Sequence, residues 1–314
     1  MVPSPMPSWS APRPTGSPGG FRWAGSFRGV LEPEAAPPPH GWGVFYECSA
    51  GSVAYRGGGI RPAVDIRGQY ASTSPTVRAE DITIIVPTRN EIRNIPAFLA
   101  SIPSDIGLIV VDASSDDTPR CIAEMRPNNT VVLRYPGTIA EARNAGTAAA
   151  RTPWLVFTDA DVTFAPGFFD RLMQHRLSDA VYGPKLSISD YKSYYAWFAR
   201  GQRLSDRLGI PAASGSNLCC RRDVLQAGGG FDPVLVVNED SEVMWRIKRG
   251  GFRVTFDSAL AVFASDHRRL KQGALRKTVH SITRCFLLYF GLLPRRWRSS
   301  DFGYWKHSKN DGRL

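Results

Sequence analysis

The chain has 314 residues and a formal net charge of +11, from 39 Lys and Arg against 28 Asp and Glu. With 43% hydrophobic and 21% charged residues, its composition is that of a globular protein and excludes a fibrous or wholly disordered chain. The five cysteines are odd in number and form no CxxC pair, which argues against a disulfide framework or a cysteine-ligated zinc site. No apolar run approaches the ~20 residues of a membrane-spanning helix, and the N-terminus lacks a secretory signal pattern. We therefore expect a cytoplasmic protein, either soluble or peripheral at the inner face of the cell membrane.

Proline, glycine and charge divide the chain into three parts. Residues 1–80 hold 12 of the 24 prolines and 12 of the 29 glycines, without a sustained hydrophobic period, so we predict a low-complexity, disordered extension. Residues 81–265 carry 20 basic and 20 acidic residues and are the predicted folded domain. Residues 266–314 carry 12 basic and 3 acidic residues, so most of the positive charge belongs to this C-terminal segment.

From residue 81 onward, short apolar runs alternate with segments of helical spacing. The predicted strands are 82–86, 108–111, 130–134 and 154–158, and the predicted helices are 95–102, 117–125 and 139–151. This alternation predicts an α/β fold with a mostly parallel sheet and helices on both faces. Ligands of such sheets bind beyond the carboxyl ends of the strands, so the residues that follow each strand are the candidates for function.

Polar residues follow three of the predicted strands. The first is followed by PTRNE (87–91), the second by DASSDDT (112–118) and the fourth by DAD (159–161). None of these is a glycine-rich phosphate loop, which argues against a dinucleotide-dependent oxidoreductase or a P-loop NTPase.

Asp159 and Asp161 are two carboxylates one residue apart at a strand end. Such a pair can bind one Mg²⁺ or Mn²⁺ ion, which takes one or two carboxylates from the protein and further oxygens from substrate phosphates. An aspartate that begins a turn and caps the next helix gives the same pattern, so the spacing alone leaves both interpretations open.

Five segments together resemble the catalytic domain of family 2 glycosyltransferases, which has the nucleotide-sugar-binding fold called GT-A. They are ITIIVPTRNE, LIVVDASSDDT, EARNAGTAAARTPWLVFTDAD, SGSNLCCRRDVLQAGGGFDP and NEDSEVMWRIKRGGFRV, in the family's order between residues 82 and 257. The resemblance implies that residues 81–265 transfer a sugar from a nucleotide-sugar to a hydroxyl or lipid-phosphate acceptor, with inversion and without a covalent intermediate. UDP is the expected nucleotide, and GDP stays open because Ala113 stands where many relatives have a second aspartate.

The resemblance also implies roles for the residues at the strand ends. Pro87, Glu91 and Asp112 would line the nucleoside pocket, while Asp159 and Asp161 would hold a Mn²⁺ or Mg²⁺ ion and the donor diphosphate. The predicted donor-binding residues are Pro87, Arg89, Glu91, Asp112, Arg143, Asp159 and Ala160.

The acidic pair Glu239-Asp240 matches the family's catalytic pair at the start of a late helix. We predict Asp240 as the general base that deprotonates the acceptor, and Glu239 as the residue that orients it. Acidic residues behind an Asn238 N-cap would also complement the dipole of a helix that runs to Arg249, so capping remains the alternative.

Two further segments stay open at the level of sequence. Arg143 and Asn144 can approach the diphosphate or only pair with Glu141 and solvent. Residues 214–217 resemble an acceptor-side loop, although a strand and turn would explain them equally well.

The C-terminal segment has an apolar stretch, 285–293, followed by PRRWR at 294–298. This pattern suits an interfacial helix on anionic lipid, where an acceptor that is a polyprenyl phosphate or another lipid-linked sugar would be delivered. The expected acceptor is therefore a glycan or a polyprenyl lipid. A helix that packs its apolar side on the catalytic domain is the alternative. His267 could bind the metal or be structural.

Two other functions were weighed against sugar transfer. A nucleic-acid-binding protein would use the basic C-terminal segment, but that segment has no helix-turn-helix, zinc or RNP pattern. A nucleotidyltransferase would also use strand-end carboxylates and a metal, but the first strand is not followed by a Gly/Lys/Arg-rich loop.

Overall fold

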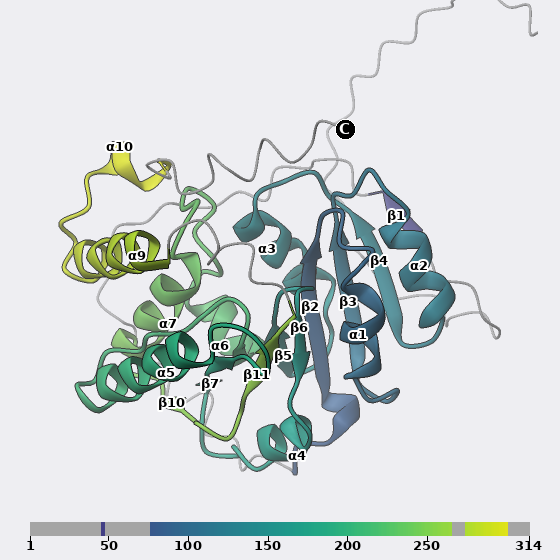
Figure 1. Cartoon of the computed structure of the whole chain (residues 1–314), viewed down its shortest axis with the longest axis horizontal. Helices are drawn as coiled ribbons and strands as arrows, with labels where there is room; N and C mark the ends of the chain where they lie inside the picture. Colours follow the sequence, from purple (N-terminus) through teal and green to yellow (C-terminus); the bar gives the residue numbers. More distant parts are fainter. Residues whose placement is uncertain (1–44, 48–75, 266–273, 301–314) are drawn as a thin grey trace, which may run out of the picture. The chain divides into compact units, whose positions relative to one another are not determined.

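The computed structural model describes residues 45–47, 76–265 and 274–300 (Figure 1). Most of the predicted extension 1–80 and the prediction for His267 therefore lie outside the described residues. The strands are β1 (Phe45–Glu47), β2 (Ile82–Thr88), β3 (Gly107–Asp112), β4 (Thr130–Arg134), β5 (Trp154–Phe157), β6 (Val162–Phe164), β7 (Ala180–Tyr182), β8 (Lys185–Leu186), β9 (Leu218–Arg221), β10 (Val254–Phe256) and β11 (Val262–Ala264). The helices are η2 (Ala79–Asp81), α1 (Ile95–Ala100), α2 (Thr118–Met125), α3 (Ile139–Ala149), α4 (Phe168–Met173), α5 (Lys192–Arg207), α6 (Arg222–Ala227), α7 (Glu239–Arg249), α9 (Ala274–Tyr289) and α10 (Arg295–Arg298).

An eight-stranded sheet in the order β1-β4-β3-β2-β5-β9-β7-β10 forms the centre of the described domain. Every neighbouring pair from β1 to β5 is parallel, and β9 is antiparallel to both β5 and β7. A second sheet, β6-β11-β8, lies beside it. The prediction of an α/β fold with a mostly parallel sheet is confirmed. The described part of the predicted extension includes β1, which pairs with β4 at the edge of the sheet.

The central strands are apolar throughout because helices cover both faces of the sheet. Alternate side chains of β2 enter two different cores: Ile84 packs with Phe98 of α1 and Ile122 of α2, whereas Ile85 packs with Ala142 of α3 and Met244 of α7. This two-sided burial holds the carboxyl ends of the strands at one edge, where the candidate residues follow (Figure 1).

Strand β2 continues through Pro87, where the sequence predicts its end. The carbonyl of Thr88 accepts a hydrogen bond from the Ala113 N–H on the β3 side. The backbone groups of successive residues in a strand point to opposite neighbouring strands, so the backbone of Pro87 points toward β5. The pairing of β2 with β5 ends at Ile85, before Pro87. The missing N–H of proline therefore costs no hydrogen bond in the sheet.

The C-terminal helix α9 packs one side on the catalytic domain. Leu288, Tyr289 and Leu293 form a buried cluster with Leu235, and the Trp245 indole of α7 donates to the Tyr289 carbonyl at 3.2 Å. One face of this helix therefore packs on the domain, as one of the two interpretations of the C-terminal segment predicted. Among the described residues, no helix combines the length and the apolar character that crossing a bilayer requires.

Candidate active site

The chain leaves β5 through the polar sequence Thr158–Asp161 and passes directly into strand β6. The interpretation of this sequence as the cap of a helix is therefore wrong. Thr158 Oγ1 donates to the Ser216 carbonyl at 2.9 Å, and Ser216 Oγ donates back to Asp159 Oδ2 at 2.5 Å. Lys185 of β8 lies on the other carboxylate, with Nζ 3.2 Å from Asp161 Oδ1 and 3.3 Å from Ser216 Oγ.

Arg143 of α3 connects the strand-end aspartates with the acidic pair of α7. Its guanidinium donates to Glu239 Oε1 at 2.7 Å, to the Gly215 carbonyl at 3.1 Å and to Asp159 Oδ1 at 3.4 Å. The side chain is only 2% exposed and lies over the Phe231 ring. A methyl group on Gly215 would come within 2.3 Å of the guanidinium, so a glycine is needed there for this placement.

The sequence left open whether Arg143 pairs with Glu141. In the structure Arg143 pairs with Glu239. Glu141 instead accepts from the backbone N–H and hydroxyl of Thr138 at the start of α3. Asn144 is also committed to structure, because its amide bonds the backbone N–H and carbonyl of Phe231 at 2.9 and 2.8 Å.

Helix α7 begins at Glu239 and ends at Arg249 before Gly250, in agreement with the sequence. Asn238 is the N-cap residue as predicted, but its side chain does not cap the helix. Asn238 has a left-handed backbone (φ 66°) and makes no side-chain cap, and its amide nitrogen reaches across to Ser281 Oγ at 2.8 Å and Cys285 Sγ at 3.0 Å on α9. The start of α7 is therefore joined to the C-terminal helix.

Asp240 is held by two backbone N–H groups. The Gly215 N–H donates to Oδ2 at 2.5 Å and the Ser241 N–H donates to Oδ1 at 2.6 Å. Ser241 Oγ also donates to the Ala213 carbonyl at 2.9 Å, which fixes α7 against residues 213–216. These contacts orient the Asp240 carboxylate without an ion pair among those described.

The structure brings both predicted acidic pairs to one cavity of about 590 Å³. Its polar end is lined by Arg143, Asp159, Asp161, Lys185, Ser214, Gly215, Ser216, Glu239 and Asp240. Residues 214–216 thus belong to the cavity, whereas the Asn217 amide is buried on the Leu260 and Pro184 carbonyls. Four carboxylates, one guanidinium and one ammonium face a common space that a substrate can enter.

The predicted nucleoside residues lie at the ends of β2 and β3 and do not line this cavity. Asp112 is fully buried, accepts from Thr88 Oγ1 and Ser114 Oγ, and forms an ion pair with Arg134. Pro87 and Glu91 are half-buried and Arg89 is exposed. Ala160 is 4% exposed and packs in the core. The nucleoside-binding roles of these residues stay predictions.

Asp159 and Asp161 fit a hard divalent cation, because both side chains line the cavity and are partly open, at 20% and 17% exposure. Two carboxylates are what Mg²⁺ or Mn²⁺ takes from a protein when substrate phosphates supply the other ligands. In the described part of the chain, no three His, Cys, Asp or Glu side chains gather into a metal cluster. A metal bound here would therefore depend on the phosphates of the donor and would compete with Lys185 for Asp161.

Sequence analysis missed Lys185 and Ser216, which contact the strand-end aspartates. Lys185 comes from a segment without a motif, and only the sheet pairing of β8 with β11 and of β9 with β5 brings the two residues to Asp161 and Asp159. Resemblance pointed to the segment around Ser216, but no signal in the sequence pointed to Lys185.

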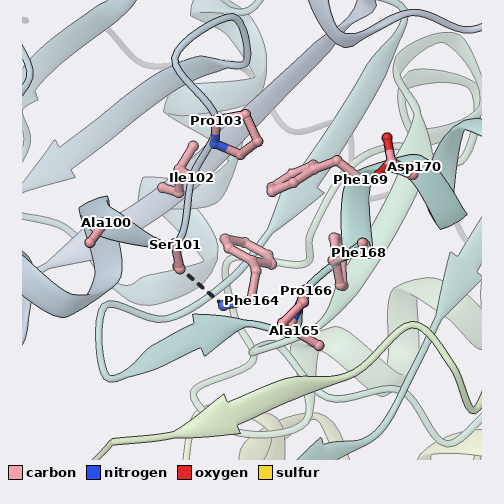
Figure 2. A pocket seen from close by; sticks show the side chains of 11 residues that line it. Ala100, Ser101, Ile102, Pro103, Phe164, Ala165, Pro166, Phe168, Phe169 and Asp170 are labelled. Carbon is pink, nitrogen blue, oxygen red and sulfur yellow. Dashed lines mark hydrogen bonds between the residues drawn. The ribbon is translucent and has the colours of Figure 1, made fainter.

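A smaller hollow of about 440 Å³ lies between residues 100–103 and 164–170 (Figure 2). Ser101 Oγ accepts from the Phe164 N–H at 3.1 Å, and Asp170 is the single ionisable side chain of the lining. The ring of Phe164 packs against those of Phe168 and Phe169. This hollow therefore offers no arrangement for acid–base or metal chemistry.

Comparison with known proteins now identifies the domain. Residues 83–229 match the family model of glycosyl transferase family 2, and residues 194–284 match that of glycosyl transferase family 21. Residues 83–229 therefore carry a glycosyltransferase family 2 sequence. A pre-mycofactocin glycosyltransferase of Mycobacterium tuberculosis is 27% identical over 224 residues, which are 64% of this chain and 46% of that protein. The chain thus spans about half the length of the curated relatives it matches.

Solved structures show that this glycosyltransferase domain has the GT-A fold. A mannosyltransferase from Pyrobaculum calidifontis in complex with GDP-Man and Mn²⁺ matches with a TM-score of 0.50 and 21% identity, over 74% of this chain and 76% of that one. S. aureus TarS 1–349 in complex with UDP-GlcNAc matches with a TM-score of 0.52 and 17% identity, over 72% and 75% of the two chains.

In this domain, the Glu239 carboxyl holds its proton more tightly than a carboxyl in solution does. Its pKa is raised from 4.5 to about 7, first by burial and then by the charge of Asp240, against the opposing charge of Arg143. The folded state therefore binds a proton at pH values where the unfolded state has released it. Consequently the free energy of unfolding falls as the pH rises from about 4.5 through about 7.

We expect Glu239→Gln to flatten this fall, because the variant has no proton to lose at position 239. The difference in unfolding free energy between variant and wild type should change by up to about 3 kcal/mol across that pH window. Urea unfolding at several pH values measures it. Glu242→Gln is the control, since Glu242 lies on the same helix and pairs with Arg246 at 2.7 Å. Parallel pH profiles for Glu239→Gln and wild type would contradict the raised pKa.

Proposed function

We propose that the chain transfers a sugar from a nucleotide-sugar, with UDP favoured over GDP, to a hydroxyl of a glycan or polyprenyl-linked acceptor, with inversion. The observation that carries the proposal is the single cavity in which Asp159 and Asp161 face Glu239 and Asp240. The family 2 match supports it, as do the nucleotide-sugars in the complexes of the two structural neighbours.

Asp159 and Asp161 are the residues that would hold the divalent cation. A bound Mn²⁺ or Mg²⁺ would supply Lewis-acid stabilisation of the departing diphosphate. Lys185 places a further positive charge at 3.2 Å from Asp161, on the side of the cavity where the leaving phosphate would carry its negative charge. Arg143 holds Asp159 in place while it pairs with Glu239.

Asp240 is the proposed general base. The acceptor oxygen attacks the anomeric carbon, the bond from that carbon to the diphosphate oxygen breaks, and the acceptor proton passes to the Asp240 carboxylate. The two backbone N–H bonds to Asp240 keep its carboxylate oriented during this transfer. Glu239, paired with Arg143, positions the acceptor rather than taking the proton.

A panel of UDP- and GDP-sugars tests this proposal directly. We expect the purified protein to hydrolyse one of them slowly in the presence of Mn²⁺ or Mg²⁺, with water as the acceptor, and to lose this turnover when EDTA is added. Release of UDP or GDP is the measurement. Turnover of none of the donors with any metal would contradict the proposed activity.

A further inference from the structure

The cavity that holds the carboxylates continues between two helices, α5 and α9. The residues of α5 that line it are Tyr194, Tyr195, Trp197, Phe198, Gly201, Gln202 and Ser205. Those of α9 are Thr278, Ser281, Ile282, Cys285, Phe286 and Tyr289, and Phe290 follows directly after the helix. Both sets recur at steps of three and four, so each helix presents one continuous face to the cavity. We call this part of the cavity the α5–α9 groove.

Among the residues whose side chains the structure describes, neither face of the groove contains a charged side chain, although both helices are rich in them. Helix α5 carries Lys192, Arg200, Arg203, Asp206 and Arg207, and none of these lines the cavity. Arg284, the one charged α9 residue whose surroundings are described, is buried on the carbonyls of Arg298 and Ser300 instead. The groove is therefore apolar at one end and opens onto four carboxylates at the other.

Several of the large apolar side chains that line the groove are more than half exposed. Trp197 is 54% exposed, Ile282 is 55% and Phe286 is 56% exposed, although all three line the cavity. Tyr194 Oη lies 2.8 Å from Thr278 Oγ1 and so connects the two walls. Packing between Phe286 and Phe290, with ring centroids 4.6 Å apart, gives the α9 wall a continuous aromatic surface.

We propose that the α5–α9 groove binds the hydrocarbon chain of an amphiphilic acceptor whose hydroxyl-bearing head lies at Asp240. This inference rests on the proposed function for the identity of the head group. The groove shares one cavity with the acidic pairs, so its occupant must leave the carboxylates open to a donor. Its exposed walls include the side chains of Trp197, Ile282 and Phe286, against which a hydrocarbon chain leaves no polar group unpaired.

Chain length is the variable that tests the groove. We expect the affinity for alkyl β-glucosides, measured by calorimetry below their micelle concentrations, to rise roughly two- to fourfold with each added methylene between methyl and octyl. Ile282→Ser should weaken binding of octyl glucoside about tenfold and leave that of methyl glucoside unchanged. Phe286→Ser should do the same, which guards against one variant failing to fold.

Val279→Ser is the matched control. Val279 lies on the same helix and is 56% exposed, as Ile282 is at 55%, but it does not line the cavity. Equal effects of the two substitutions, or an affinity that does not change with chain length, would overturn the proposal. Retention on anionic vesicles is a second measurement. If glucoside binding did not depend on chain length and Ile282→Ser and Val279→Ser were retained on the vesicles equally well, the exposed face of α9 would be assigned to a membrane surface and the proposal would be overturned.

The nucleotide-sugar panel separates this inference from the proposed function. Binding that depends on chain length without turnover of any donor would support the groove and overturn sugar transfer. Metal-dependent donor hydrolysis with binding that ignores chain length would support sugar transfer and overturn the groove.

Discussion

Asp161→Ala is expected to lower metal-dependent hydrolysis of the nucleotide-sugar about a thousandfold. The substitution removes one of the two carboxylates that line the cavity after β5, and Asp159 alone remains to hold a cation. Metal stabilisation of a leaving diphosphate accounts for several kcal/mol of the activation barrier, and a thousandfold loss corresponds to about 4 kcal/mol. The measurement is nucleotide release as a function of metal concentration.

The arrangement of Lys185 makes the test sharper. Without Asp161, its ammonium keeps the contact with Ser216 Oγ at 3.3 Å and still faces the cavity. The residual activity of Asp161→Ala should therefore respond little to metal, because the remaining positive charges belong to side chains. Asp190→Ala is the control, since Asp190 is exposed and does not line the cavity. Wild-type metal dependence in Asp161→Ala would rule out the proposed role of Asp161.

Local patterns in the sequence predict the elements that the central sheet buries on both faces. Strand β4 has the predicted bounds, β3 is one residue longer than predicted at each end, and β5 is one residue shorter at its end. Each of these strands is a short apolar run between polar residues, so the bounds of the run in the sequence are close to those of the buried strand. The start of α7 at Glu239 was also predictable from its acidic first turn.

The contacts of the site depend on long-range packing, which local patterns do not contain. Arg143 and Glu239 are 96 residues apart in sequence, and their ion pair follows from the packing of α3 and α7 against the same face of the sheet. Asn238 illustrates the same point. Its residue type favours an N-cap and it does occupy that position, but its side chain makes no cap hydrogen bond and its amide nitrogen instead contacts Ser281 and Cys285 of α9.

The α5–α9 groove was only half visible in the sequence. The apolar stretch 285–293 was predicted to be a surface for lipid or for packing, whereas nothing was predicted for the helix at 192–207. In the structure Leu288 is buried in one cluster with Leu235, while Phe286 is exposed and lines the groove. The spacing of apolar residues in the sequence indicates which side of a helix is apolar, but it does not indicate what that side contacts.

Asp240→Asn is expected to abolish transfer while donor binding persists. Asparagine keeps the size of the side chain and one oxygen for a backbone N–H, but it has no carboxylate to accept the proton of the acceptor. Loss of a general base costs typically 10²- to 10⁴-fold in rate, and we expect a loss of about 10³-fold here. The measurements are sugar transfer under saturating donor and donor affinity by calorimetry.

The division between the two measurements is what makes Asp240→Asn informative. Asp240 lies across the cavity from the strand-end aspartates and is held by the N–H groups of Gly215 and Ser241, so its loss leaves Asp159 and Asp161 in place. Glu242→Gln, on the same turn of α7, should keep both activities because Glu242 pairs with Arg246 outside the cavity. If Asp240→Asn weakened donor binding and transfer by the same factor, Asp240 would be a donor-binding residue. The base would then have to be sought in Glu239, whose raised pKa suits a proton acceptor near neutral pH.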